Sequence, residues 1–332
     1  MKALNIGVLG ATGAVGREML KILEERDFPI EKLTLLSSKR SAGKTLTFKG
    51  EEITLIEAAD DVFEGVDIVL GAADNPVAKQ FAPAIVKAGA VFVDNSSAFR
   101  LLDTVPLVIP EINPEDVKWH QGIISNPNCS TIITLMAASV LNRLSPIETI
   151  VASTYQAASG AGAGGPIELA EEIAAYQNGE TYEPKVFPYP LAYNVIPSIG
   201  SPLDNGYTTE EMKMQNEGRK ILHLPEMLVS CTCVRVPVMR SHSISATIVT
   251  KEKITVEEAK EAFRHAEGIL LEDDLPNKVY PMPLLTSGKD ITLVGRIRED
   301  LTKPRGLTLF VAGDQVRKGA ALNTIQIAEL LL

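Results

Sequence analysis

The stretch LNIGVLGATGAVG (residues 4–16) predicts how the chain begins to fold. Residues 4–9 form a short apolar run typical of a β-strand, three glycines follow at once, and residues 17–25 carry apolar side chains at helical spacing. A strand, a glycine turn and a helix in that order can bind the pyrophosphate of a dinucleotide at the helix N-terminus. The spacing is GxxGxxG rather than GxGxxG, and a plain strand-to-helix turn is the alternative. The candidate cofactor-binding residues of this turn are Gly10, Thr12, Gly13, Ala14, Val15 and Gly16.

A basic segment rich in hydroxyl groups follows the second predicted strand, Leu33–Leu36. In a fold selective for NAD, an acidic residue near the end of this strand binds the ribose 2′-OH. This chain has SSKRSAGK (residues 37–44) there instead. Cations and hydroxyls suit a 2′-phosphate, so we predict NADP, held by Ser38, Arg40 and Ser41. A solvated basic loop is the alternative.

The next segments continue an alternation of strands and helices. Short strands are expected at residues 53–56, 66–70 and 91–93, with a helix over 77–88. This alternation predicts a parallel sheet with right-handed crossovers. The small residues of GAADNP (71–76) at the end of one strand leave room for a ligand, as an open α/β sheet requires.

A cysteine lies at the centre of SNPNCST (residues 125–131). A short strand with Ile123 and Ile124 precedes this motif, and an apolar run of helical length follows it and ends near Arg143. Cys129 is therefore expected at the start of a buried helix, where exposed N–H groups favour a thiolate and could bind an oxyanion. A thiol pKa of about 8.5 falls to roughly 3.5–7.5 in such settings. A buried structural cysteine is the alternative.

Length and composition exclude several classes of protein. The 332 residues suffice for two domains, and 45% hydrophobic with 22% charged residues is ordinary for a globular protein. A net charge of −10 argues against a nucleic-acid partner. No apolar run reaches the ~20 residues that span a bilayer. Three cysteines do not suggest a disulfide framework, so we expect a cytoplasmic protein with reduced thiols.

The second half of the chain predicts a different domain. A strand at 149–155 leads into the glycine-rich QAASGAGAGGP (156–166), which we interpret as a loop at a site rather than a linker. Strands at 229–238, 245–249, 293–298 and 307–312 predict a mixed sheet, with helices over 169–176, 208–222 and 256–266 and a final helix from Gly313-Asp314-Gln315 to Leu332. Residues 183–202 hold five prolines and are expected to form an irregular arm.

Several polar residues of this half have a plain alternative reading. Glu210 and Lys213 lie three apart on the predicted helix, which a solvated pair explains. Cys231 and Cys233 share one face of a strand and are expected in the core, because one intervening residue and no second pair make a poor metal site. Arg235 on the same face needs a partner. His242 follows that strand, and most lone histidines are structural.

Three motifs resemble those of aspartate-semialdehyde dehydrogenases: SNPNCST, QAASGAG (156–162) and CVRVPVMRSHS (233–243). N-acetyl-glutamyl-phosphate reductases usually have glycine where this chain has Asn128, and glyceraldehyde-3-phosphate dehydrogenases share Ser-Asn-x-x-Cys with other neighbours. The resemblance runs from the glycine turn to the last helix. Another acyl-phosphate reductase and a non-catalytic nucleotide-binding regulator are the rival readings.

The resemblance implies a fold and an assembly. It implies an α/β protein with a Rossmann-type NADP-binding domain of residues 1–127 and 313–332. The second, α+β domain of residues 128–312, with a mixed sheet, would serve catalysis and dimerisation. A homodimer or homotetramer without metal is implied.

The resemblance also implies a reaction: NADPH-dependent reductive dephosphorylation of L-4-aspartyl phosphate to L-aspartate 4-semialdehyde through a cysteine thioester. This step belongs to lysine (diaminopimelate), threonine and methionine biosynthesis and to the EC 1.2.1.11 type. The resemblance implies that Cys129 is the nucleophile and His242 the acid/base group. Gln156 would orient the substrate and Asn128 contact it, while Glu210 would bind its amine, Arg235 its carboxylate, and Arg100 and Lys213 its phosphate. Ser159 and Gly160 would face the nicotinamide, with Gln315 near the cofactor.

Overall fold

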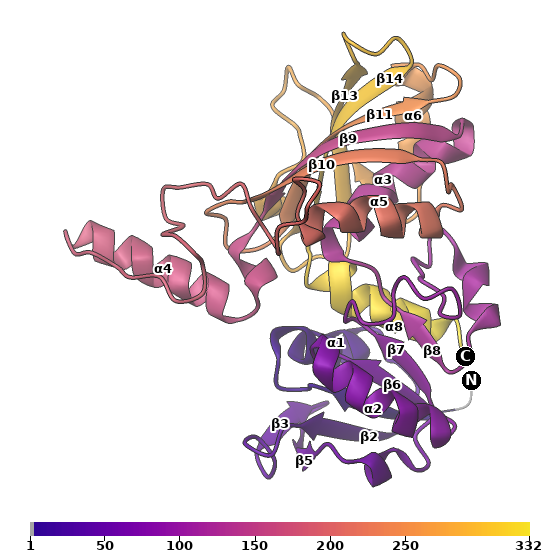
Figure 1. Ribbon diagram of the computed structural model, residues 1–332, viewed down its shortest axis with the longest axis vertical. Helices are drawn as coiled ribbons and strands as arrows, with labels where there is room; N and C mark the ends of the chain where they lie inside the picture. Colours follow the sequence, from indigo (N-terminus) through magenta and orange to yellow (C-terminus); the bar gives the residue numbers. More distant parts are fainter. Residues whose placement is uncertain (1–2) are drawn as a thin grey trace. The chain divides into compact units, whose positions relative to one another are not determined.

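The computed structural model describes residues 3–332, which form two compact units, one of residues 3–128 with 320–332 and one of residues 129–319 (Figure 1). The first unit contains a six-stranded sheet in which every neighbouring pair is parallel. Its order is β5 (Ile56–Glu57), β2 (Ile30–Ser37), β1 (Leu4–Leu9), β6 (Ile68–Gly71), β7 (Val91–Asp94), β8 (Ile123–Ser125). Counted along the chain within this sheet, the order is 3-2-1-4-5-6, so the prediction of a Rossmann-type domain is confirmed.

Helices cover both faces of the parallel sheet. Neighbouring residues of β1 point to opposite faces: Val8 belongs to one apolar cluster and Leu9 to another. The cluster of Val8 includes side chains of α1 (Ala14–Glu25) and α8 (Leu322–Glu329). The cluster of Leu9 includes those of α2 (Asn75–Lys87) and the 3₁₀ turn η1 (Asp60–Phe63). The carboxyl ends of β1 and β6 therefore meet at the switch point where ligands bind in such folds.

The second unit is built on a mixed six-stranded sheet, as predicted. Its order is β10 (Leu228–Arg235), β9 (Ile147–Gln156), β11 (His242–Thr250), β14 (Gly306–Gly313), β13 (Thr292–Glu299), β12 (Ile269–Leu271). The pairs β10–β9 and β12–β13 are parallel and the others antiparallel. Helices α3 (Cys129–Leu144), α5 (Thr209–Ile221) and α6 (Val256–Arg264) pack on one face. In β9, Ala152 and Thr154 are buried under them while Val151 and Tyr155 on the other face are exposed.

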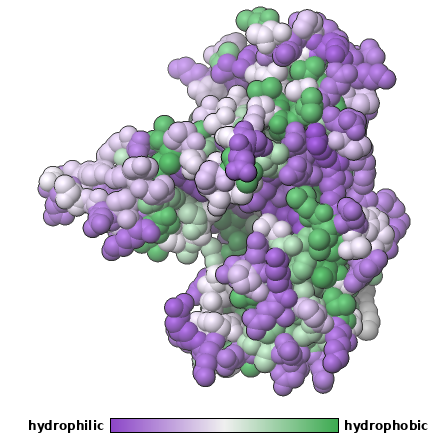
Figure 2. Space-filling model, in the orientation of Figure 1, coloured by the Kyte–Doolittle hydropathy of each residue, from purple (hydrophilic) through white to green (hydrophobic). Residues whose placement is uncertain are grey.

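Helix α4 (Gly164–Gln177) and the chain after it extend away from the mixed sheet (Figure 1). Two buried carboxylates of α4 hold this arm: Glu168 accepts from three backbone N–H groups of residues 185–187, and Glu172 from those of Leu191 and Ala192. Burial opposes ionisation of Glu168, but the three N–H groups lower its pKa on balance. Figure 2 shows apolar side chains among the polar ones on this projection. Tyr189 and Tyr193 in the chain after α4 are exposed. The irregular arm was predicted, and residues 183–202 contain no helix or strand.

Some predicted boundaries were wrong. The strand expected at 53–56 is divided, because Leu55 donates its N–H to the carbonyl of Lys44. The residues before Leu55 form β4 (Glu51–Thr54), which makes a hairpin with the unpredicted β3 (Thr45–Phe48). The residues after Leu55 form β5, which pairs with β2 in the parallel sheet. The strand expected to reach 238 ends at Arg235, since Pro237 cannot donate to a ladder.

The last two helices also differ from the prediction. Helix α4 begins five residues before the expected Leu169, because Pro166 fits a first helical turn. The last α-helix begins at Leu322 rather than near Gln315. Before it, β14 continues through Gly313 and residues Arg317–Ala321 form a π-helical turn. The short α7 (Pro283–Thr286), η2 (Pro114–Trp119) and η3 (Ala158–Ala161) complete the described chain, in which no helix is long and apolar enough to cross a membrane.

Candidate active site

The glycine turn of the first unit has the backbone geometry that a dinucleotide requires. Gly10 has φ +88°, and a Cβ there would lie 2.8 Å from the carbonyl oxygen of Ala72. A Cβ on Gly16 would lie 2.4 Å from the carbonyl oxygen of Gly10. Gly13 precedes α1 without a side-chain cap. The turn thus leaves the N–H groups of the helix start open to an anion, while Ala14 and Val15 lie in the first helical turn.

A cavity of about 400 Å³ lies at the carboxyl ends of β1, β2 and β6. Gly10, Thr12, Gly13 and Ser38 are among its lining residues, so the structure brings these predicted residues together. Arg40 is exposed and Ser41 half-buried in the adjoining turn, outside the lining. Lys39 and Glu57, which were not predicted, line the cavity too.

Arg100 lies in the first unit as a buried side chain. Its Nε donates to the carbonyl of Asn126 at 2.9 Å and its Nη2 to that of Asn95 at 2.7 Å. Burial raises the pKa of nearby Asp94, against the opposing effects of Ser96 and of the Arg100 charge. Asn128 is also buried.

The second unit gathers four predicted residues around one edge of the mixed sheet. Gln156 ends β9 and Arg235 ends the parallel β10, and the two are register partners. His242 begins β11, which runs antiparallel on the other side of β9. Carboxyl ends of parallel strands therefore meet the amino end of an antiparallel one. Cys129 begins α3, which packs against this sheet, and a thiolate there would raise the pKa of Arg235.

His242 is fully buried. The backbone N–H of Ala157 donates to its Nδ1 at 3.0 Å, and Nε2 lies 3.4 Å from Nε2 of Gln156. Burial, and next the charge of Arg235, lower the pKa of His242 to about 3, with Glu210 opposing. Because Nδ1 accepts the shorter bond, the neutral ring carries its proton on Nε2.

A polar chain links the end of β9 to α5. The hydroxyl of Thr154 donates to Oε1 of Gln156, so the amide NH₂ of Gln156 faces Oε1 of Glu210 at 3.3 Å. The other oxygen of Glu210 contacts Nζ of Lys213 at 2.7 Å. Glu210 is buried, so a solvated pair does not describe these residues.

Arg235 is held on two sides. Its Nη1 donates to the carbonyl of Ala157 at 2.7 Å, and its guanidinium lies 5.8 Å from the ring centroid of Phe187. Burial lowers its pKa, and the negative charges of Cys129 and Glu210 oppose this. The guanidinium also lines a cavity of about 450 Å³ together with Ala161, Val186, Phe187, Pro188, Tyr189, Ile196, Ser198, Ile199 and Gly200.

Two glycines lie directly against these side chains. A Cβ on Gly160 would be 2.6 Å from Nη1 of Arg235 and 3.0 Å from Cε1 of His242. A Cβ on Gly319 would be 2.9 Å from Cβ of Cys129. Gly319 was missed from the sequence, because only the π-helical turn, a feature often found at functional sites, brings it there.

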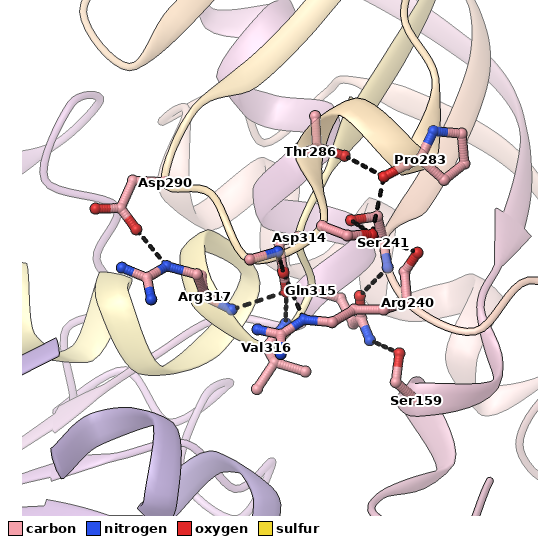
Figure 3. A network of polar contacts seen from close by, with 12 residues as sticks. Ser159, Arg240, Ser241, Pro283, Thr286, Asp290, Asp314, Gln315, Val316 and Arg317 are labelled. Carbon is pink, nitrogen blue, oxygen red and sulfur yellow. Dashed lines mark hydrogen bonds and ion pairs between the residues drawn. The ribbon is translucent and has the colours of Figure 1, made fainter. Parts of the chain in front are cut away.

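Ser159 and Gln315 contact each other in the second unit (Figure 3). Nε2 of Gln315 donates to the hydroxyl of Ser159, and its Oε1 accepts the N–H of Ser241 at 2.9 Å. Both the nitrogen and the oxygen of the Gln315 carboxamide therefore form hydrogen bonds within the second unit. Cys231 and Cys233 are buried with their sulfurs 3.8 Å apart, as expected of core residues. Among the described residues, no three His, Cys, Asp or Glu side chains are grouped to hold a metal ion.

The arrangement suits acyl transfer. A thiol at a helix N-terminus can form an acyl intermediate, buried cations favour its thiolate, and a neutral Nε2–H can donate to an oxyanion. The buried Glu210 and Arg235 provide one charge of each sign for an amino acid.

Comparisons with known proteins identify the same two parts. The family model described as semialdehyde dehydrogenase, NAD binding domain, matches residues 5–120, and the semialdehyde dehydrogenase dimerisation domain matches residues 138–318. An aspartate-semialdehyde dehydrogenase of Synechocystis is 48% identical over 99% of this chain and 97% of its own length. The crystal structure of aspartate semialdehyde dehydrogenase II of Vibrio cholerae complexed with ASA has a TM-score of 0.97 at 41% identity, covering 100% and 98% of the two chains. The enzyme of Candida albicans with NADP has a TM-score of 0.78 at 25% identity, covering 99% and 98%.

Proposed function

The chain belongs to the aspartate-semialdehyde dehydrogenase family, and from this premise we propose that it reduces L-4-aspartyl phosphate to L-aspartate 4-semialdehyde with NADPH. The observation that carries the proposal is the convergence of Gln156, Arg235 and His242 at one edge of the mixed sheet, against which the helix that begins with Cys129 packs. The Vibrio cholerae relative, whose structure is complexed with ASA, supports the substrate.

Cys129 carries the covalent step. Its thiolate attacks the acyl carbon, the bond to phosphate breaks, and a thioester forms. NADPH, when bound, would supply the hydride for the reduction of this thioester to a thiohemiacetal. The carbon–sulfur bond then breaks, the aldehyde leaves and the thiolate is restored. His242, the predicted acid/base group, is assigned to this cycle as a neutral ring whose Nε2–H donates a hydrogen bond to the acyl oxygen.

Charged and polar side chains hold the substrate. We assign its carboxylate to Arg235, its amine to Glu210, and its phosphate to Arg100 and Lys213. Gln156 orients the acyl group and Asn128 contacts it. The burial of Arg235 and Glu210 supports their assignment, because buried charges need partners and a zwitterionic amino acid supplies both.

The glycine turn is the cradle for the cofactor, since a Cβ at Gly10 or Gly16 would collide with backbone. We assign the pyrophosphate to Gly10, Thr12, Gly13, Ala14, Val15 and Gly16, and the 2′-phosphate to Ser38, Arg40 and Ser41. The nicotinamide is assigned to Ser159 and Gly160, with Gln315 nearby. NADP is preferred over NAD because the cavity is lined by Ser38 and Lys39 where NAD-selective folds place an acidic residue after the second strand.

We further propose a cytoplasmic homodimer or homotetramer, formed through the second unit, with an NADP-binding domain of residues 1–127 and 313–332 and a catalytic domain of residues 128–312. The match to a dimerisation domain and the exposed Val151, Tyr155 and Tyr193 support assembly. The two compact units support this division except for residues 313–319, which belong to the second unit, since the joints lie at 128/129 and 319/320.

The proposal is tested in the reverse direction, with L-aspartate semialdehyde, phosphate and either NADP or NAD, by the absorbance of the reduced cofactor. Activity that requires phosphate and favours NADP is expected. Activity that requires phosphate but favours NAD would overturn the cofactor assignment alone. Folded, reduced protein without activity on either cofactor would overturn the proposed reaction.

A further inference from the structure

The turn that leads into His242 is strained and buried. Ser241 has φ +77°, a left-handed conformation that is costly for a residue with a side chain, and it is fully buried. Such a conformation persists only where the surroundings fix it. Since Ser241 directly precedes His242, whatever holds this turn also sets the direction of the imidazole.

The neighbouring strand supplies two side chains that hold the turn (Figure 3). Gly313, the register partner of His242, is followed by Asp314 and Gln315. Oδ2 of Asp314 accepts from Nε of Arg240 at 2.6 Å, and Oε1 of Gln315 accepts from the backbone N–H of Ser241 at 2.9 Å. Asp314-Gln315 thus holds Arg240-Ser241 by two hydrogen bonds, and we call these four residues the clasp.

Asp314 is the centre of the clasp. It is fully buried, and its carboxylate also accepts from the backbone N–H groups of Gly288 at 2.6 Å, Val316 at 2.8 Å and Arg317 at 3.1 Å. Ser287, next to Gly288, places its hydroxyl 3.1 Å from the carbonyl oxygen of Arg240. A buried carboxylate with this many donors is firmly fixed, and it fixes the turn in its place.

The clasp also contacts Ser159, a second residue with a proposed function. Gln315, held by Ser241, donates to the hydroxyl of Ser159, the residue assigned to the nicotinamide. Ser159 in turn donates its backbone N–H to the carbonyl of Met239, in the same turn. The positions of His242 and of Ser159 are therefore coupled through one set of hydrogen bonds.

We propose that Asp314 is a positioning residue for the reaction: through Arg240 and Gln315 it holds the left-handed Ser241, and so sets both the imidazole of His242 and the hydroxyl of Ser159. The role rests on the proposed function, because it is defined by the catalytic use of His242. Asp314 touches none of the reacting groups itself.

The test compares Asp314→Asn with Asp290→Asn in the full-length enzyme. Asp314→Asn turns an amide NH₂ toward the donors of Arg240 or Gly288, whereas Asp290 contacts Arg317 in the same network but neither Arg240 nor Ser241. We expect kcat to fall about 30-fold in Asp314→Asn, with the KM for phosphate and the rate of Cys129 alkylation by iodoacetamide within threefold of the wild-type values. Asp290→Asn should keep the wild-type kcat.

A rescue experiment separates positioning from general destabilisation. Glycine adopts φ +77° without penalty, so Ser241→Gly in the Asp314→Asn background should raise kcat at least fivefold over Asp314→Asn alone. If Asp314→Asn does not fold, Arg240→Gln, whose side chain is one-third exposed, removes the other half of the ion pair and should lower kcat similarly.

Two outcomes would overturn the proposal: folded Asp314→Asn with kcat within twofold of wild type, or no rescue by Ser241→Gly. A wild-type enzyme without phosphate-dependent activity would contradict the proposed function rather than the clasp. In that case the ¹⁵N resonances of the His242 ring decide, and they should shift in Asp314→Asn and not in Asp290→Asn.

Discussion

The backbone N–H of Ala157 donates a hydrogen bond to Nδ1 of His242 across 3.0 Å. A second proton on the ring would have to occupy the same space as this N–H. The guanidinium of Arg235 opposes the imidazolium as well. His242 is therefore a neutral ring that presents Nε2–H, and burial and the charge of Arg235 both favour this neutral form.

We predict that His242 stays neutral in the folded enzyme from pH 8 down to pH 5, with the proton on Nε2. The ¹⁵N chemical shifts of the ring, in enzyme labelled at its 4 histidines, distinguish this tautomer from the other and from the imidazolium. A His242 signal with both nitrogens protonated at pH 6 would contradict the assignment.

The same shift predicts a dependence of stability on pH. An unfolded histidine has a pKa of about 6.5, so below that pH the unfolded chain holds a proton that folded His242 lacks, down to a pKa of about 3. The contribution of His242 to the free energy of unfolding is fully present above pH 6.5, and it falls by about 1.4 kcal/mol per pH unit as the pH is lowered toward 4. His242→Asn keeps an acceptor for Ala157, and in denaturant titrations at pH 7 and pH 5 it should lose less stability than wild type. Equal losses would contradict the shift.

Gly160→Ala is predicted to lower kcat/KM by ten- to a hundredfold with little change in fold. The added methyl group would lie 2.6 Å from Nη1 of Arg235 and displace that side chain or His242. Gly218→Ala is the matched control, because its Cβ would lie 3.0 Å from the flexible end of Met227 and an ordinary 3.7 Å from Leu135. Steady-state kinetics with both variants check this, and wild-type kinetics for Gly160→Ala would show that the two side chains have room to move.

Gly16→Ala is predicted to weaken NADPH binding at least tenfold. A methyl group 2.4 Å from the carbonyl oxygen of Gly10 forces the glycine turn open. Gly7→Ala in β1 is the control, since its nearest neighbour is Val69 at 3.4 Å. Titration of NADPH fluorescence gives both dissociation constants, and equal values would contradict the role of the turn.

Ser38→Asp is predicted to shift the preference from NADP toward NAD by at least tenfold in the ratio of kcat/KM. A carboxylate in this lining position repels a 2′-phosphate and can accept from a 2′-hydroxyl. Arg40→Ala should shift the ratio in the same direction, because it removes a cation from the adjoining turn. An unchanged ratio in both variants would place the 2′-phosphate elsewhere.

The Rossmann-type sheet could be predicted because its signals are local. The residues 4–16 contain a strand, a turn and a helix start in a single run, and buried parallel strands are continuous apolar segments. The predicted strand boundaries were wrong where a single hydrogen bond or a proline determines where a strand ends, as at Leu55 and Pro237. The predicted start of the last α-helix was wrong because the chain after Asp314 first forms the π-helical turn Arg317–Ala321, although Asp314 does accept from the backbone N–H groups of Val316 and Arg317 as a helix-capping residue does.

The residues of the candidate site could be predicted from the sequence, but the hydrogen bonds that connect them could not. Motifs name Cys129, Gln156 and His242, and spacing puts Glu210 and Lys213 on one helix face. The tautomer of His242 depends on a backbone N–H, which every non-proline residue has and no motif reveals. A π-helical turn brings Gly319 to Cys129, and the turn that Asp314 contacts contains the left-handed Ser241; neither conformation has a local sequence signal.

The most direct test of the account is to mix the enzyme with L-aspartate semialdehyde and NADP in the absence of phosphate. With no phosphate to release the acyl group, the account predicts a burst of about one NADPH per active site. Mass spectrometry should then find one aspartyl group on the peptide that contains Cys129, and Cys129→Ser, though folded, should show neither burst nor adduct. A burst with the adduct on another residue, or steady phosphate-dependent turnover by Cys129→Ser, would contradict the central claim that Cys129 is the nucleophile.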